Sequence, residues 1–214
     1  MNRPIATLLG SNIIWRASGF TYPTAVVATR GLYMSPEAYL QASRHQMEGL
    51  KPLLPTSRIL EFGCGLGGNL LAIAPRIRIG YGLDVNNGYV RIARRLARQF
   101  RIENVHFSRY DGRAIPEFGL LDLVISVGVF ERLSPAAVRT YLQQLMNQTT
   151  PSGKLAMCFL MDRARGTAFS KRLGDTAYHF WTHDELQALA SSLGLKIEFI
   201  FGFSEAADMY ILGH

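Results

Sequence analysis

The stretch R58-I-L-E-F-G-C-G-L-G-G-N69 decides the fold class of this chain. Its apolar first half predicts a buried β-strand, and the glycines that follow predict a tight turn into a helix beginning near Asn69. Glycine lets the backbone turn sharply and lets a ligand touch it, because it has no Cβ atom. Backbone N–H groups at the start of the helix then face that ligand. The stretch therefore predicts a strand–loop–helix unit that binds a ligand.

Strands and helices alternate in the sequence on the C-terminal side of this unit. Alternation of this kind indicates parallel strands with helices on both faces of the sheet. The run LDLVISVGVF at 121–130 is almost continuously apolar, as expected for a strand covered on both sides. Strands are predicted at 58–62, 79–85, 105–110, 121–130 and 154–161, and helices from 69, at 88–100 and at 134–147.

Further elements are predicted before and after the alternating strands and helices. Ser35 and Pro36 predict the start of a helix that reaches about residue 50 and stops before Pro52. Thr182, with Glu185 three residues later, predicts a capping box. Two apolar runs at 196–203 and 208–214 are too close for a parallel crossover, so they must form an antiparallel hairpin.

These elements define the fold class as α/β, a Rossmann-like sheet of seven mostly parallel strands with an antiparallel C-terminal hairpin and helices on both faces. A ligand is expected over the carboxyl ends of the strands, where the winding direction switches. The domain spans 35–214, and residues 1–34, which are irregular and carry Trp15 and Tyr22, are expected to form a lid on the substrate side. Tyr33 and Tyr39 are candidate ligand contacts, although packing explains both more simply.

Composition limits the class of protein. The chain has 214 residues, a net charge of +7 and only two cysteines, Cys64 and Cys158, both in apolar runs. A buried thiol behaves as a small hydrophobic group, and the absence of a disulfide or metal-binding spacing favours a cytoplasmic protein without a metal site. No apolar run is long enough for a membrane span, and no signal peptide is indicated. The positive charge permits an anionic small molecule, lipid or nucleic acid as a partner.

The glycine segment alone leaves two cofactors open. Gly63, Gly65 and Gly68 also fit the dinucleotide fingerprint GxGxxG, and Asp84 lies 21 residues after Gly63, where a ribose-binding acid is expected. Three features weaken a nicotinamide cofactor: 57 residues precede the segment, the C-terminal hairpin does not suit an all-parallel sheet, and Asp111 adds a third acid.

Four ordered motifs over roughly residues 35–214 resemble those of the class I S-adenosylmethionine-dependent methyltransferases of the small-molecule type. The glycine segment with Glu61 resembles the first motif, and GLDVN with Asp84 resembles the second. Tyr110-Asp111-Gly112 resembles the segment that carries the adenine-side acid, and LDLVISVGVFERL resembles the segment of the fourth strand. All four fall at predicted strand ends, in the context that a motif match requires.

The resemblance implies S-adenosyl-L-methionine as the cofactor. It implies that Asp84 accepts hydrogen bonds from both ribose hydroxyls, since a carboxylate offers two oxygens. It places Asp111 at the adenine amino group, the N–H of Gly112 at a ring nitrogen, and Glu61 near the methionine amino group. The implied cofactor-binding set is Glu61, Gly63, Cys64, Gly65, Gly67, Asp84, Val85, Asp111, Gly112, Ser126 and Val127. Ordinary structural roles compete for some of these: an Asp-Gly turn for Asp111 and sheet core for Ser126 and Val127.

The general base is not implied by the resemblance. Many small-molecule members have histidine where this chain has Arg132, and the neighbouring Glu131 is expected to be a solvated helix-start residue. A histidine titrates near pH 7 and suits proton removal from an oxygen or nitrogen acceptor. His179, in Tyr178-His179-Phe180-Trp181, is expected at the carboxyl edge and is the candidate catalytic residue, with a structural loop histidine as the alternative.

The favoured function is methyl transfer to an oxygen or nitrogen of a small molecule. Segment 126–129 lacks the [DNS]PP[YF] sequence that marks transfer to base nitrogens in the family. The alternatives are an RNA methyltransferase, a nicotinamide oxidoreductase, an aminopropyl transferase and a cofactor-binding protein without activity. Basic residues after the fifth strand suggest an anionic acceptor: Arg163, Arg165, Lys171 and Arg172.

Overall fold

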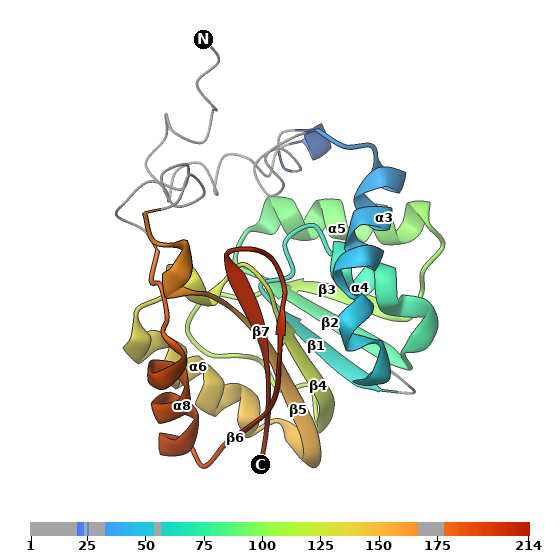
Figure 1. The fold of residues 1–214 in the computed structure, drawn as a ribbon. Coiled ribbons are helices and arrows are strands. Elements are labelled where there is room, and N and C mark those ends of the chain that lie inside the picture. The colour runs from blue at the N-terminus through green and yellow to red at the C-terminus, as the bar shows by residue number, and fades with distance from the viewer. Residues whose placement is uncertain (1–20, 24, 26–32, 54–56, 167–177) are drawn as a thin grey trace.

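The computed structural model describes residues 21–23, 25, 33–53, 57–166 and 178–214 (Figure 1). One seven-stranded sheet with the order β3-β2-β1-β4-β5-β7-β6 forms the centre of this part of the chain. The strands are β1 (Arg58–Phe62), β2 (Ile79–Asp84), β3 (Val105–Arg109), β4 (Leu121–Ser126), β5 (Thr149–Leu160), β6 (Lys196–Gly202) and β7 (Ala207–Gly213).

The strand directions confirm the predicted mixed sheet. Strands β1 to β5 pair in parallel, with Leu60 of β1 in register with Tyr81 of β2 and Val124 of β4. Strand β7 is antiparallel to both of its neighbours, β5 and β6. The reversed strand therefore lies one place in from the edge, and β6 is the outermost strand on that side.

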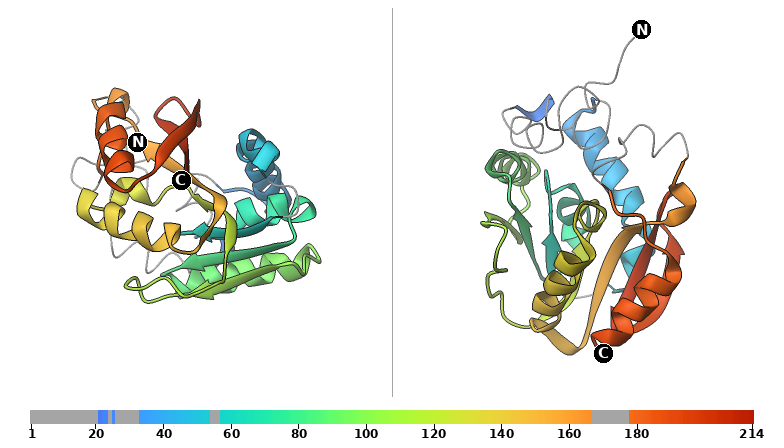
Figure 2. Two further views of the ribbon diagram at one scale, coloured as in Figure 1. Left: turned by 90° about the horizontal axis from the view of Figure 1, so that it is seen from below. Right: turned by 90° about the vertical axis from the view of Figure 1, so that its left-hand side faces the viewer.

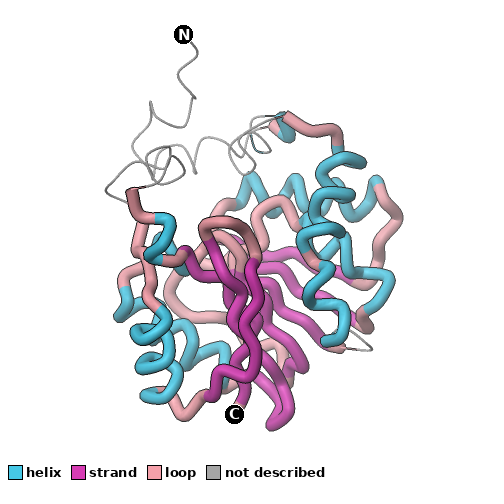
Figure 3. The backbone as a smooth tube through the Cα atoms, viewed as in Figure 1, coloured by secondary structure: helices cyan, strands magenta, loops and turns pink. Residues whose placement is uncertain are grey.

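Helices cover both faces of the sheet (Figures 1 and 2). The helices are α3 (Pro36–Gln46), α4 (Gly68–Ile73), α5 (Asn87–Gln99), α6 (Pro135–Met146) and α8 (His183–Ser192). Helices α3, α4 and α5 pack in one apolar cluster, and α6 and α8 pack in another. Figure 3 shows the sheet in magenta between these two groups of helices in cyan.

Side chains of the central strands point alternately into the two apolar clusters. Ile59, Leu123 and Ile125 enter the cluster with α3, α4 and α5, whereas Leu60 and Val124 enter the opposite one. Successive side chains of a strand point to opposite faces, so a continuously apolar strand can be buried on both sides. The apolar sequence of β1 and β4 therefore requires the helices on both faces.

Side-chain caps begin four of the helices, three of them at predicted positions. The hydroxyls of Ser35 and Ser134 accept from backbone N–H groups of α3 and α6, and Thr182 forms the predicted capping box with Glu185. Asn86 caps α5, and its side chain accepts from the N–H groups of Gly88 and Tyr89. Each cap satisfies donors that the helix itself leaves without a partner.

Several boundaries differ from the prediction. Strand β4, predicted to reach residue 130, already ends at Ser126, and the chain then turns into the 3₁₀ segment Phe130–Arg132. Helix α3 ends at Gln46, and a 3₁₀ segment at Glu48–Leu53 carries the chain past Pro52. Helix α4 has only six residues, because Pro75 follows and the chain continues as the 3₁₀ turn Ala74–Arg76. Strand β5 begins at Thr149, with an irregularity in its pairing to β4 between Leu121 and Leu123.

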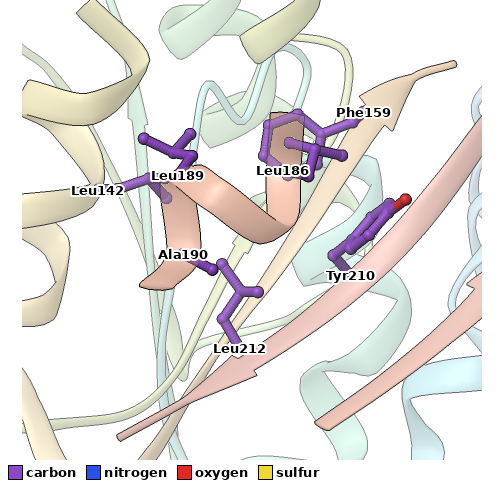
Figure 4. A pocket seen from close by; sticks show the side chains of 7 residues that line it. All are labelled: Leu142, Phe159, Leu186, Leu189, Ala190, Tyr210 and Leu212. Atoms are coloured by element: carbon purple, nitrogen blue, oxygen red, sulfur yellow. The ribbon is translucent and has the colours of Figure 1, made fainter. Parts of the chain in front are cut away.

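A small cavity under α8 belongs to the core rather than to a binding site. It has a volume of about 10 Å³ and is lined almost entirely by carbon (Figure 4). That volume holds about one water molecule, and an apolar lining offers it few partners. The lining residues are Leu142, Phe159, Leu186, Leu189, Ala190, Tyr210 and Leu212. No helix among the described residues is long and apolar enough to cross a membrane.

Candidate functional site

The loop between β1 and α4 has backbone conformations that require glycine. Gly63 and Gly67 have φ angles of +76° and +77°, and a Cβ atom on Gly63 would lie 2.1 Å from Cγ2 of Val129. The N–H groups of Gly63 and Cys64 both donate to the carbonyl of Leu83 at 2.8 Å, which ties the loop to the end of β2. The fold therefore fixes this loop before any ligand binds.

Gly65 is the glycine of the loop whose backbone is open to a ligand. Its φ is +53°, and no described atom lies within 4 Å of the place that a Cβ atom would take. The thiol of Cys64 is buried beside Gly82 of β2, and burial raises the pKa of the Cys64 thiol well above its usual value. Cys64 therefore shapes the loop through its backbone, and Gly65 forms its exposed surface.

Asp84, the last residue of β2, joins this loop to the start of α5. One carboxylate oxygen accepts from the N–H of Gly65 at 2.9 Å, and the other accepts from the N–H of Asn86 at 2.8 Å. Burial raises the pKa of Asp84, and these two hydrogen bonds oppose that rise. Each oxygen keeps a lone pair, so the carboxylate can still accept from two adjacent hydroxyls of a ligand. The structure thus fits the ribose-binding role that the resemblance implies.

Glu61 and Asn69 form a buried polar pair behind the loop. The Asn69 amide donates to Oε1 of Glu61 at 2.7 Å, and both side chains are at least nine-tenths buried. The carbonyl oxygen of Asn69 has no hydrogen-bond partner among the described residues. A buried acceptor without a donor is unfavourable, so this oxygen fits an ammonium or hydroxyl group of a ligand.

Val85 and Gly112 form an apolar surface beside Asp84. Val85 is 53% exposed, and its Cγ1 lies 3.5 Å from the place of a Cβ atom on Gly112. The Tyr141 hydroxyl donates to the carbonyl of Gly112 and holds this turn. Asp111 is exposed and accepts from the N–H of Arg113 at 2.9 Å, so it forms a local turn in this structure. The surface between Val85 and Gly112 suits a flat ring such as adenine.

The end of β4 closes the site on its other side. The Ser126 hydroxyl donates to the carbonyl of Phe62 at 2.9 Å, and Ser126 is 1% exposed. Val127 is half-buried and packs on the cluster with α3, α4 and α5. The Ser126 side chain therefore belongs to the core, whereas the partly accessible Val127 leaves its backbone and part of its side chain open to a ligand.

Glu131 differs from its expected solvated state. It lies in a 3₁₀ turn after β4 and is partly buried, and burial raises the pKa of its carboxyl group above its usual value. Arg132 stacks over the ring of Tyr178, with its guanidinium carbon 4.8 Å from the ring centroid. The tertiary fold brings residues 178–181 against this turn, and the local sequence gave no sign of that burial.

His179 lies beside this turn at the carboxyl edge, as predicted. Its backbone N–H donates to the carbonyl of Glu131 at 2.7 Å, and its ring meets Trp181 edge-on with centroids 4.4 Å apart. The buried atoms His179 Nε2 and Trp181 Nε1 have no hydrogen-bond partner in the described part of the chain. Two adjacent ring nitrogens without partners are the strongest indication of a polar ligand on this side of the site.

Other predicted contacts lie elsewhere or outside the described residues. Tyr39 is 5% exposed and packs against Gly68 and Tyr22, so packing accounts for it. Tyr33 is 57% exposed. Most of the expected lid, including Trp15, lies outside the residues that the structure describes.

The two described basic residues after β5, Arg163 and Arg165, are paired with acidic side chains. Arg163 forms two hydrogen bonds to Asp208, and Arg165 pairs with Asp162 at 2.8 Å. Lys171 and Arg172 belong to 167–177, outside the described residues. The two arginines that are described thus give little support to an anionic acceptor.

Three residues of the site were missed by sequence reasoning. Asn69 holds Glu61, Asn86 donates its N–H to Asp84, and Tyr141 holds Gly112 from α6. Asn86 had a detectable signal, because asparagine is a preferred helix cap. Asn69 and Tyr141 are recognised only once the helices are packed on the sheet.

One known protein family matches the part of the chain that contains the site. Residues 59–153 match a family model described as a methyltransferase domain. This range covers the glycine loop, Asp84, Asp111 and the end of β4. The match agrees with the methyltransferase resemblance rather than with a nicotinamide oxidoreductase.

Solved structures share the fold across most of the chain. A DhpI complex with SAM and HEP is 13% identical and covers 100% of both chains with a TM-score of 0.70. Magnesium protoporphyrin IX methyltransferase (ChlM) from Synechocystis PCC 6803 with bound SAH is 14% identical, at a TM-score of 0.70, over 94% of this chain and 99% of that one. A SAM-dependent methyltransferase from Aquifex aeolicus is 17% identical, at a TM-score of 0.64, over 84% and 98%.

One curated relative is an uncharacterized protein, RP028, from Rickettsia prowazekii (strain Madrid E). It is 28% identical over 106 residues, which are 48% of this chain and 42% of that protein. The match thus covers less than half the length of this relative.

Proposed function

Since the chain carries a class I S-adenosylmethionine-dependent methyltransferase domain, we propose that it transfers a methyl group to an oxygen or nitrogen atom of a small-molecule acceptor. The observation that carries this proposal is the pair of buried ring nitrogens at His179 and Trp181, beside the end of β4. They offer polar contacts to a ligand that lies next to the cofactor.

The cofactor is held by groups that the fold already fixes. Asp84 binds the ribose hydroxyls, Gly65 lines the path of the methionine chain, and Val85 with Gly112 covers the adenine. Asn69 and Glu61 receive the amino group, because an acceptor oxygen of Asn69 is buried without a donor. The backbone at Ser126 and Val127 holds the methionine end. Preorganised contacts of this kind cost little reorganisation on binding.

S-adenosylmethionine supplies a methyl group already activated on a sulfonium sulfur. The protein has to hold the acceptor in line with the methyl carbon and exclude water. The residues named above would hold the cofactor, whose sulfonium would supply the methyl group to a lone pair of the acceptor and keep the electron pair of the broken carbon–sulfur bond. An acceptor that carries a proton on the reacting atom would lose it, and a side chain beside the acceptor is suited to take it.

His179 is the proposed proton acceptor. Its Nε2 has no hydrogen-bond partner among the described residues and can receive a proton, and its backbone N–H donates to the carbonyl of Glu131 at 2.7 Å. A general base near pH 7 is well matched to oxygen or nitrogen acceptors. The carboxyl group of Glu131, with its pKa raised by burial, is the second candidate for the same task.

A small acceptor is favoured over a nucleic-acid base. The segment at 126–129 reads Ser-Val-Gly-Val, without the proline motif of enzymes that modify base nitrogens. A protein of the same fold is a magnesium protoporphyrin IX methyltransferase, which shows that the fold accommodates small acceptors. RNA methylation remains the alternative, and an RNA substrate in the assay below distinguishes the two.

The test measures S-adenosylhomocysteine release with a panel of phenols, amines, carboxylic acids and a mixed RNA pool. We expect turnover with a small molecule and none with RNA. His179→Gln should then lower kcat at least 10²-fold and leave the affinity for S-adenosylhomocysteine unchanged, since general bases contribute about 10²–10⁴-fold.

His183→Gln is the matched control. His183 lies four residues away, and its Nδ1 is already paired with the Tyr210 hydroxyl at 3.3 Å. Its substitution should leave kcat near the wild-type value. Normal turnover of His179→Gln would reject His179 as the base, and the same assay on Glu131→Gln would then decide for or against the carboxylate. Turnover of RNA alone would reject the small-molecule acceptor.

A further inference from the structure

Most of the net positive charge of the chain lies on one side of the sheet. Residues 87–113 contain seven arginines and two acidic residues, a net +5 of the total +7. All seven arginines are exposed on or next to α5 and the edge strand β3. We call this the α5–β3 surface; its arginines are Arg91, Arg94, Arg95, Arg98, Arg101, Arg109 and Arg113.

Acidic side chains do not neutralise the α5–β3 surface. The four ion pairs between described residues are Lys51–Glu48, Lys154–Glu198, Arg163–Asp208 and Arg165–Asp162, all in other parts of the fold. Like charges that remain unpaired repel one another and raise the local potential, so this surface attracts anions.

A groove runs along this surface between α5 and the free edge of β3. It has a volume of about 390 Å³ and is lined by Arg94, Ala97 and Arg98 from the helix and by residues 105–108 of the strand. Helix α5 has 13 residues and is therefore roughly 20 Å long. Arginines at 91, 94, 95 and 98 recur every three or four residues, so they share one side of the helix.

The groove is closed to an added β-strand. An unpaired edge usually offers its carbonyls and N–H groups to another strand. Here Nε of Arg94 donates to the carbonyl of Phe107 at 2.8 Å, on the side of β3 that has no neighbouring strand. The guanidinium occupies an acceptor that an incoming peptide would need.

The surface also lacks what a membrane or a protein partner requires. The apolar side of α5, with Tyr89, Ile92 and Leu96, is buried against the sheet. No large hydrophobic residue in 87–113 is exposed: those exposed in the described structure are Tyr33, Val85, Leu120 and Phe199. Membrane-binding helices bury an apolar face in lipid, and protein interfaces have an apolar centre. Phosphate groups bind to a charged surface without any exposed apolar residues.

We propose that the α5–β3 surface binds the phosphodiester backbone of a nucleic acid. Guanidinium groups bind phosphate oxygens in pairs, which makes arginine better suited than lysine to this contact. The surface goes beyond the proposed methyl transfer, since it binds phosphates whichever acceptor the active site takes. Helix α5 begins three residues after Asp84, so a bound strand runs toward the rim of the cofactor site.

The experiment is fluorescence anisotropy of a labelled 20-nucleotide single-stranded RNA, titrated with the protein at several salt concentrations. The wild-type protein should bind, with an affinity that falls steeply with salt. R91Q/R95Q/R98Q removes three exposed arginines from α5 and keeps a good helix-forming residue at each position. It should reduce the slope of log affinity against log salt by about 2 and weaken binding about 100-fold at 0.1 M salt.

R44Q/R139Q/K196Q is the matched control, because it removes the same charge from exposed positions on α3, α6 and β6. It should keep nearly the wild-type slope and affinity. Both variants should keep their circular dichroism and their affinity for S-adenosylhomocysteine, which separates this test from that of the proposed function. DNA of the same sequence should bind comparably, because phosphate contacts carry no sequence information.

Three results would overturn the proposal. The first is an absence of RNA binding by the wild-type protein at 0.1 M salt. The second is equal weakening by both triple variants, which would mean that net charge alone attracts RNA. The third is equally tight, R91Q/R95Q/R98Q-sensitive binding of poly-glutamate or phosphatidylserine vesicles, which would assign the surface to an acidic protein or a membrane.

Discussion

Replacing Asp84 with alanine should strongly weaken cofactor binding while leaving the protein folded. The carboxylate is expected to accept from two ribose hydroxyls, and hydrogen bonds to charged groups contribute about 1.5–3 kcal/mol each. Losing both hydrogen bonds should then reduce the binding free energy by about 3–6 kcal/mol, which is roughly a 10²–10⁴-fold loss of affinity for S-adenosylhomocysteine. Calorimetric titration of the wild-type protein and Asp84→Ala measures this ratio.

The same substitution also leaves two backbone donors, the N–H groups of Gly65 and Asn86, without their acceptor. Asp122→Ala controls for such a loss. Its carboxylate accepts from the N–H of Arg58 at 2.7 Å, at the amino end of the same sheet. Both variants should lose some thermal stability, but Asp122→Ala should bind S-adenosylhomocysteine as the wild-type protein does.

A ligand without the ribose hydroxyls shows whether Asp84→Ala weakens binding by removing the contact to these hydroxyls or by disturbing the glycine loop. The dideoxy analogue of S-adenosylhomocysteine should bind the wild-type protein as weakly as Asp84→Ala binds the natural ligand. Asp84→Ala should not distinguish the two ligands, because the interaction is already lost. If the variant still discriminates between them by 100-fold, the hydroxyls bind elsewhere and the assignment of Asp84 is refuted.

Three further predictions concern the loop, a helix cap and a buried acid. Gly63→Ala should lower the melting temperature and the cofactor affinity more than Gly194→Ala does: both positions have positive φ, but only at Gly63 would the new Cβ atom meet a side chain, that of Val129. Thr182→Ala should cost about 1 kcal/mol by urea denaturation, because it removes the capping box of α8; no change would mean that the cap is dispensable. Glu131→Gln should match the wild-type free energy of unfolding near pH 4 and exceed it near pH 7. Burial raises the folded-state pKa of Glu131 above 4.5, so wild-type stability falls as pH rises from the unfolded-state pKa through that higher value; parallel pH profiles would contradict this.

The central part of the fold was predictable because its signals are local. Alternation of apolar strands with capped helices predicted the sheet, and the short interval between the last two runs predicted the hairpin. Gly63, Gly65 and Asp84 were identified together because parallel strands bring their carboxyl ends to one edge. The order of the strands places these ends side by side, within the residues 59–153 that match a methyltransferase-domain model.

The remaining features depend on contacts between distant segments. The burial of Glu131 requires residues 178–181, almost 50 positions later, to pack beside it. The hydrogen bond from Tyr141 to Gly112 requires α6 to lie on the sheet in a particular register. The early start of β5 follows from an irregular pairing at Leu121 and Leu123. No local periodicity encodes such contacts, so sequence reasoning could name the residues but not their environment.

The position of β7 between β5 and β6 determines when both of these strands obtain their shared partner. Strand β6 is synthesised before β7, yet β7 is its sole partner in the described sheet. Until Ala207–Gly213 arrives, β6 has nothing to pair with, and β5 presents an open edge. Strand β6 carries Phe199 and Phe201, and an unpaired apolar strand in an incompletely folded chain is prone to aggregate. During refolding, aggregation should therefore be most pronounced before the β6–β7 hairpin docks on the open edge of β5.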